Sequence, residues 1–175
     1  MVAVSLDGYI ADKNGSVDWL SIVPTTDETQ KDFTNFMNTV DCLVIGRNTF
    51  EVVKSFGEWI YDKKVFVVSN SMTSIPNGYE DKIELINGLP SEIVKSIHNK
   101  GYNNLYIDGG KTIQNFLEED LIDEMIISVV PIILGGGKSL FGEMENSKEF
   151  QLIDTKVLSD KLVQSHYKKT SRQII

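Results

Sequence analysis

The segment Leu105-Tyr106-Ile107-Asp108-Gly109-Gly110-Lys111-Thr112 is the stretch from which we interpret the rest of the chain. A short apolar run followed by two glycines and a lysine is typical of a buried strand that turns directly into a helix. Glycine lets a backbone approach a phosphate closely, and the free N–H groups of a helix start attract anions. The segment therefore predicts an anion site, although a tight strand-to-helix turn alone would also explain the two glycines.

Two other apolar runs end in a similar way. Gly46-Arg47-Asn48-Thr49 follows the run Leu43–Ile45, and Ser69-Asn70-Ser71 follows the run Val65–Val68. Ligands of open α/β sheets bind at the carboxyl ends of the strands. Arg47 alone has a simpler interpretation as a solvated charge, and Ser69 and Asn70 alone as turn caps. Three such strand ends together predict a cradle long enough for a dinucleotide.

Strands and helices alternate through the middle of the chain, and strands follow one another near its end. We expect helices at 26–39, 48–54, 90–99 and 111–119, and strands at 2–6, 43–45, 65–68, 83–86, 105–107, 125–130, 150–158 and 162–169. Residues 7–21 are expected to form a loop, with a turn at Asn14-Gly15. This order predicts an α/β fold in three layers: a central, mixed, mostly parallel sheet with helices on both faces and a C-terminal antiparallel hairpin. No linker divides the chain, so we expect one domain over residues 1–175.

Composition and charge exclude several classes of partner. Hydrophobic residues make up 41% and charged residues 24% of the 175 residues, as in ordinary globular domains. A net charge of −8 disfavours nucleic acid and anionic membranes as partners. No apolar run is long enough to span a bilayer, and the first residues show no signal-peptide pattern. The lone Cys42 forms no internal disulfide, fits a reducing compartment such as the cytoplasm, and is better explained as a buried thiol than as a nucleophile.

Two apparent motifs do not carry their usual meaning. Gly135-Gly136-Gly137-Lys138-Ser139 looks like a phosphate-binding P-loop, but Ile132 stands where that motif requires glycine. The GxGxxG fingerprint of dinucleotide-binding Rossmann domains is also absent as a strand-to-helix motif. His98 and His166 have no partner at metal-ligand spacing, so we assign no metal.

Longer motifs point to a known family. They are Ser5-Leu6-Asp7-Gly8-Tyr9-Ile10-Ala11, Val44-Ile45-Gly46-Arg47-Asn48-Thr49-Phe50-Glu51, Ile107-Asp108-Gly109-Gly110-Lys111 and Val130-Pro131-Ile132-Ile133-Leu134-Gly135-Gly136-Gly137. On these residues the chain resembles the dihydrofolate reductase-like superfamily. It is most similar to the riboflavin-biosynthesis (RibD C-terminal) reductase domain family and its stand-alone relatives. The resemblance covers nearly the whole chain.

The resemblance implies NADPH as cofactor and hydride transfer to a small heterocycle or ribosylamino-pyrimidine, a riboflavin precursor or pterin-like compound. Arg47 matches the arginine at the 2′-phosphate. The other residues expected at the cofactor are Ala3, Ile10, Gly15, Gly46, Thr49, Ser69, Asn70, Ser71, Gly109, Gly110, Lys111, Thr112 and Ile113. Trp19 matches a wall of the pocket, and Asp7 and Glu143 are expected near the substrate. For Asp7, a role in stabilising the turn is an equally open alternative.

The catalytic carboxylate is the least defined part of this prediction. The expected helix offers Asp27, Glu28 and Asp32, none of them at the position at which the classical enzyme carries its acid. We take Asp27 as the catalytic candidate, while an acidic first turn also stabilises a helix. The alternative is a non-catalytic NADPH-binding module of the same fold. Relatives of this kind are usually homodimers, so we expect one here, with the C-terminal strands as an interface.

Overall fold

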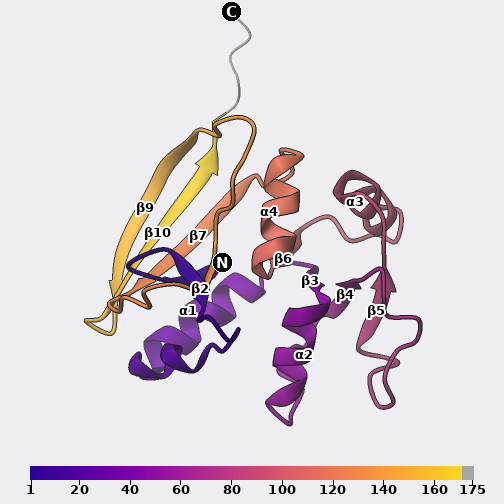
Figure 1. The fold of residues 1–175 in the computed structure, drawn as a ribbon, viewed down its shortest axis with the longest axis horizontal. Coiled ribbons are helices and arrows are strands. Elements are labelled where there is room, and N and C mark those ends of the chain that lie inside the picture. The colour runs from indigo at the N-terminus through magenta and orange to yellow at the C-terminus, as the bar shows by residue number, and fades with distance from the viewer. Residues whose placement is uncertain (171–175) are drawn as a thin grey trace, which may run out of the picture. The chain divides into compact units, whose positions relative to one another are not determined.

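The structure is a computed structural model that describes residues 1–170 (Figure 1). Its contacts divide the chain into two compact units. The central unit is Asn35–Leu121, and the terminal unit combines Met1–Thr34 with the chain from Ile122 onward. We describe each unit by itself, and the single domain over residues 1–175 stays a prediction.

The central unit is built on a parallel four-stranded sheet in the order β5-β4-β3-β6. Its strands are β3 (Cys42–Gly46), β4 (Lys64–Val68), β5 (Ile83–Ile86) and β6 (Leu105–Asp108). Its helices are α2 (Arg47–Ser55), α3 (Pro90–His98) and α4 (Gly110–Glu118), each of which follows a strand. The predicted alternation of strand and helix is therefore confirmed, with boundaries that differ by at most one residue.

The core of the central unit follows from strand register. Leu43 pairs with Val65 on one side and Tyr106 on the other, and Val65 pairs with Ile83, so these side chains form one row across the sheet. Phe50 of α2 packs on this cluster and is fully buried. Because both faces of parallel strands are covered, the strands are continuous apolar runs. Cys42 lies in β3, where burial raises the pKa of its thiol to about 12, as expected of an inert buried cysteine.

The terminal unit contains a mixed sheet in the order β1-β7-β10-β9. Its strands are β1 (Val2–Ser5), β7 (Glu124–Val130), β9 (Phe150–Leu158) and β10 (Leu162–Lys169). β1 and β7 are parallel, whereas β9 and β10 form the predicted antiparallel hairpin. Ser159 and Asp160, at the centre of its tight turn, have positive φ values of 52° and 54°, and the Lys161 N–H donates to the Leu158 carbonyl at 3.1 Å, as is common in hairpin turns. Helix α1 (Asp27–Met37) starts in this unit and ends in the central one.

The loop predicted for residues 7–21 is only partly correct. It contains a short strand, β2 (Tyr9–Ala11), and a 3-10 helix, η1 (Asp18–Ile22). β2 pairs antiparallel with β8 (Lys138–Ser139), which directly follows the three glycines. Gly137 has a φ of 150°, and a side chain there would collide with the Ala11 carbonyl oxygen. The pairing depends on a distant segment, so local pattern did not predict it.

No helix within residues 1–170 is long and apolar enough to cross a membrane.

Candidate functional site

The three strand ends that the sequence singled out meet at one edge of the central sheet. β3 lies between β4 and β6, and all three run parallel, with Gly46 opposite Val68 and Ile45 opposite Asp108. Gly46 is the last residue of β3. Arg47, Ser69–Ser71 and Gly109-Gly110 directly follow the three strands. The structure therefore brings the predicted phosphate-binding residues of the central unit to a common edge.

Two glycines let the starts of α2 and α4 approach each other. A Cβ on Gly46 would lie 2.8 Å from Thr112 Oγ1, and a Cβ on Gly109 would collide with Thr49 Oγ1. Gly109 also has a φ of +92°, which residues with a side chain rarely adopt. Each glycine is the N-cap of its helix, and neither helix has a side-chain cap. The first N–H groups of both helices are therefore left for another acceptor.

Arg47 is held at this edge by the β4 end. Its Nη1 donates to Ser71 Oγ at 2.8 Å, and Ser69 Oγ accepts the N–H groups of Ser71 and Met72 at 3.2 and 3.0 Å. The guanidinium is exposed and retains unused donors. An exposed arginine beside two hydroxyl groups is a suitable environment for a phosphate.

The remaining predicted residues of this edge divide by exposure. Asn70 and Lys111 are exposed, whereas Thr112 and Ile113 are buried. The Ile113 N–H donates to the Gly109 carbonyl at 2.8 Å within the helix, and its side chain belongs to the core, so its place at the cofactor stays a prediction. Asp108, which the sequence analysis did not select, ends β6 beside Gly109, and burial raises the pKa of its carboxyl group. A carboxyl group with a raised pKa beside a glycine cradle is a feature of functional sites that sequence pattern does not reveal.

In the terminal unit, Asp7 ties two loops together. Its Oδ1 accepts the Ser5 hydroxyl at 2.6 Å and the Leu134 N–H at 3.1 Å, and its Oδ2 accepts the Gly135 N–H at 2.8 Å. These donors, the Ser5 hydroxyl above all, lower the pKa of Asp7. The carboxylate thus fixes the start of the triple-glycine loop, which favours the structural alternative for Asp7 over direct contact with substrate.

The other predicted residues of the terminal unit lie in or near β1 and β2. Ala3 is in β1 and Ile10 in β2, and Gly15 forms a turn with a φ of +83° whose N–H donates to the Asp12 carbonyl at 3.0 Å. Trp19 lies in η1 and is 9% exposed. Its indole Nε1 is buried and has no hydrogen-bond partner among residues 1–170. A buried donor without an acceptor is unusual, and it agrees with a place at the wall of a polar site.

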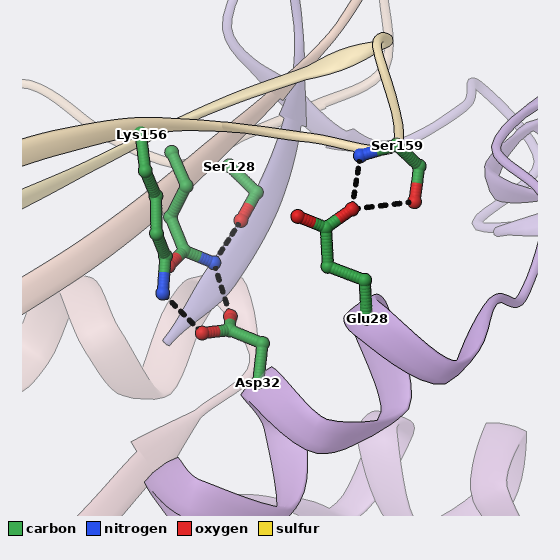
Figure 2. Close-up of polar contacts among 6 residues, drawn as sticks. Glu28, Asp32, Ser128, Lys156 and Ser159 are labelled. Atoms are coloured by element: carbon green, nitrogen blue, oxygen red, sulfur yellow. Dashed lines mark hydrogen bonds and ion pairs between the residues drawn. The ribbon is translucent and has the colours of Figure 1, made fainter.

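The acidic residues of α1 differ in their surroundings. Asp27 is exposed in the first turn, where it complements the helix dipole. Figure 2 shows Glu28 directed at the hairpin turn, where it accepts the Ser159 N–H at 2.8 Å, and Asp32 directed at Lys156. Glu143 is exposed and lies outside the helices and strands. The structure gives Asp27 and Glu143 no contact that points to chemistry, and their roles stay predictions.

Comparison with known proteins defines the class of this molecule. The fold is that of the riboflavin-type reductases within the dihydrofolate reductase-like superfamily. The family model described as the RibD C-terminal domain matches residues 1–164, so the chain belongs to this family.

Individual relatives agree with the family. The chain is 36% identical over 170 residues to the uncharacterized protein YwjB of Bacillus subtilis (strain 168), covering 95% of this chain and 94% of YwjB. It is 53% identical, with a TM-score of 0.92 and 97% coverage of both chains, to a solved protein from Shewanella sp. PV-4 whose name connects it with riboflavin biosynthesis.

A bifunctional enzyme shares the fold only. The Thermotoga maritima diaminohydroxyphosphoribosylaminopyrimidine deaminase/5-amino-6-(5-phosphoribosylamino)uracil reductase has 15% identity and a TM-score of 0.74. The match covers 97% of this chain but 55% of that enzyme. Family and relatives together support a reductase-type function.

Proposed function

We propose that the chain is an NADPH-dependent reductase that transfers a hydride to a small heterocycle or ribosylamino-pyrimidine. The observation that carries this proposal is the common edge formed by the ends of β3, β4 and β6. At this edge, two uncapped helix starts, two glycines and Arg47 lie on neighbouring parallel strands. This is the arrangement that binds the phosphates of a dinucleotide.

The residues present fit NADPH in particular. The close approach at Gly46 and Gly109 leaves N–H groups of α2 and α4 for a pyrophosphate. Arg47, held by Ser71, would receive the 2′-phosphate, together with Ser69 and Asn70. Both sites are local sources of positive potential in a chain of net charge −8. They therefore explain how an acidic protein would hold an anionic cofactor.

Bound NADPH supplies the hydride, and the protein supplies placement and exclusion of water. We assign Ala3, Ile10 and Gly15 to the nicotinamide end and Trp19 to the pocket wall. As substrate we propose a compound such as 5-amino-6-(5-phosphoribosylamino)uracil, which the Thermotoga relative's name includes. The proton that accompanies the hydride is assigned to Asp27. Asp108, which directly precedes Gly109, is half-buried, and its carboxyl group has a raised pKa.

Titration with NADPH and NADH, before and after Arg47→Ala, tests the proposal. We expect the unchanged protein to bind NADPH more tightly, because Arg47 makes a charge-assisted contact with the 2′-phosphate. The substitution should remove about 1.5–3 kcal/mol of NADPH binding and leave NADH binding nearly constant. The measurement is isothermal calorimetry or quenching of protein fluorescence.

Lys54→Ala is the matched control, because Lys54 is a cation at the opposite end of α2. It should leave the preference for NADPH unchanged. Equal affinity of the unchanged protein for NADPH and NADH would contradict the role of Arg47. Tight NADPH binding without turnover of any pyrimidine or pterin substrate would favour the non-catalytic alternative.

We also propose a homodimer formed through the outer hairpin. Leu152, Val157 and Val163 are 54%, 60% and 45% exposed, and the register places them on one face of β9 and β10. Gln164 and Lys156, which contact Asp32, point to the opposite face. An exposed apolar sheet face of this kind marks an interaction surface, and a symmetric pair buries it with a copy of itself.

Val157→Asp should convert the dimer to a monomer, since it introduces two charges into the paired face. Light scattering should give twice the chain mass of 19.7 kDa for the unchanged protein and the single mass for the variant. Ile133→Asp is the control, because Ile133 is 71% exposed and lies outside the hairpin. A monomer mass for the unchanged protein over a wide concentration range would refute the dimer.

A further inference from the structure

A chain of side-chain contacts runs from α1 across the sheet of the terminal unit (Figure 2). Asp32 Oδ1 forms an ion pair with Lys156 of β9. Asp32 Oδ2 accepts a hydrogen bond from Gln164 Nε2 of β10 at 2.9 Å. The same Nε2 donates to Ser128 Oγ of β7 at 3.0 Å. Gln164 and Ser128 are buried, with exposures of 5% and 7%.

The chemistry of Asp32 fixes the direction of every bond in this chain. A carboxylate paired with a lysine accepts hydrogen bonds and has none to donate. The amide atom of Gln164 that faces Asp32 must therefore be the nitrogen. Because this one nitrogen also faces Ser128, it must donate there as well, and Ser128 Oγ must accept.

Ser128 is consequently left with a hydroxyl hydrogen to donate. Within residues 1–170, the Ser128 side chain makes one hydrogen bond, which it accepts from Gln164, so its hydroxyl hydrogen has no acceptor there. A buried donor without a partner is unfavourable, so an acceptor supplied by a ligand would gain a full hydrogen bond. Trp19 Nε1 of the same unit is a second buried donor that lacks an acceptor.

Strand register places Ser128 beside the proposed cofactor site. Ser128 lies directly opposite Ala3 of β1, so the two side chains share one face of the sheet. Ala3 is assigned above to the nicotinamide end of the cofactor. On that proposed function, we infer that the Ser128 hydroxyl donates to a carbonyl oxygen of the bound ligands, with Gln164, Asp32 and Lys156 as positioning residues. The oxygen belongs either to the nicotinamide carboxamide or to the pyrimidine substrate.

Ser128→Ala tests the donor. If the carboxamide is the acceptor, NADPH should bind about three- to tenfold more weakly. Binding of 2′-phospho-ADP-ribose, which lacks the nicotinamide, should not change. If the substrate carbonyl is the acceptor, NADPH binding should be unchanged, and KM for 5-amino-6-(5-phosphoribosylamino)uracil should rise by a similar factor.

Asp32→Asn tests the positioning. Because asparagine can donate as well as accept, the Gln164 amide can rotate so that its oxygen faces Ser128. The Ser128 hydroxyl would then donate to Gln164 and would no longer be available to the ligand. The same ligand should therefore bind more weakly, although Asp32 does not touch it. In a protein that already carries Ser128→Ala, Asp32→Asn should cause no further loss of ligand affinity. If the two residues acted independently, the losses of the two single variants would add in the double variant.

Glu28→Gln is the matched control, since it removes a carboxylate of the same helix that contacts the same hairpin but not Ser128. It should leave all ligand affinities unchanged. Unchanged affinity and KM in Ser128→Ala, or an equal loss of NADPH and 2′-phospho-ADP-ribose binding, would overturn the inference. If the unchanged protein binds no NADPH, the proposed function fails, and the donor role fails with it.

Discussion

Phe50→Ala should lower the free energy of unfolding by about 3–5 kcal/mol, the largest stability effect that we expect from a single side chain in the central unit. Phe50 is fully buried on the row of strand side chains. Its ring packs against Tyr79 at 5.5 Å and Trp59 at 6.3 Å between centroids. Truncation removes these contacts and leaves a cavity that rigid strands cannot fill.

Urea unfolding measures this effect as a lower midpoint with an unchanged slope. The control is Phe56→Ala, since Phe56 follows the same helix but is 52% exposed. It should change the stability by less than about 0.5 kcal/mol. Similar losses in both variants would mean that Phe50 does not anchor α2 to the sheet.

Gly109→Ala should weaken NADPH binding at least about tenfold and destabilise the fold by about 1–3 kcal/mol. The new methyl group would be forced into a φ of +92° and against Thr49 Oγ1. The starts of α2 and α4 would then move apart, and their N–H groups would no longer converge on one pyrophosphate. Calorimetric titration with NADPH measures the loss of binding, and unfolding in urea measures the loss of stability.

Gly101→Ala separates strain from contact. Gly101 has nearly the same φ, +91°, but nothing lies within 4 Å of its added Cβ. This control should lose stability through backbone strain and retain NADPH affinity. If both variants bind NADPH as tightly as the unchanged protein, the close approach at Gly109 does not shape the site.

Comparison of prediction and structure shows which features are local. The strands of the central unit and the helices after them were predicted correctly, because apolar period and glycine boundaries act within a few residues. The edge shared by Gly46, Ser69 and Gly109 was predicted for the same reason, since parallel neighbours end on one side. Arg47 was predicted to lie at this edge because it comes directly after Gly46 at the end of β3.

Other features depended on distant partners. β2 exists because β8 pairs with it, and Asp7 binds N–H groups 127 and 128 residues away. Asp27 was chosen among three acids from spacing alone, whereas the structure distinguishes them by what lies opposite: solvent for Asp27, Ser159 for Glu28, and Lys156 with Gln164 for Asp32. The periodicity of apolar residues carries no information about such contacts between distant segments of the chain.

The sequence alone therefore determined the α/β pattern, the family motifs and the edge at which the strand ends of the central unit meet, because propensity, turn chemistry and strand direction are properties of short segments. Tertiary structure alone decided which acids are exposed, which loops Asp7 joins, and that Ser128 retains a hydroxyl hydrogen. These features depend on which hydrogen-bond donors and acceptors lie next to each other in the folded chain. The register of strands that are distant in sequence decides this.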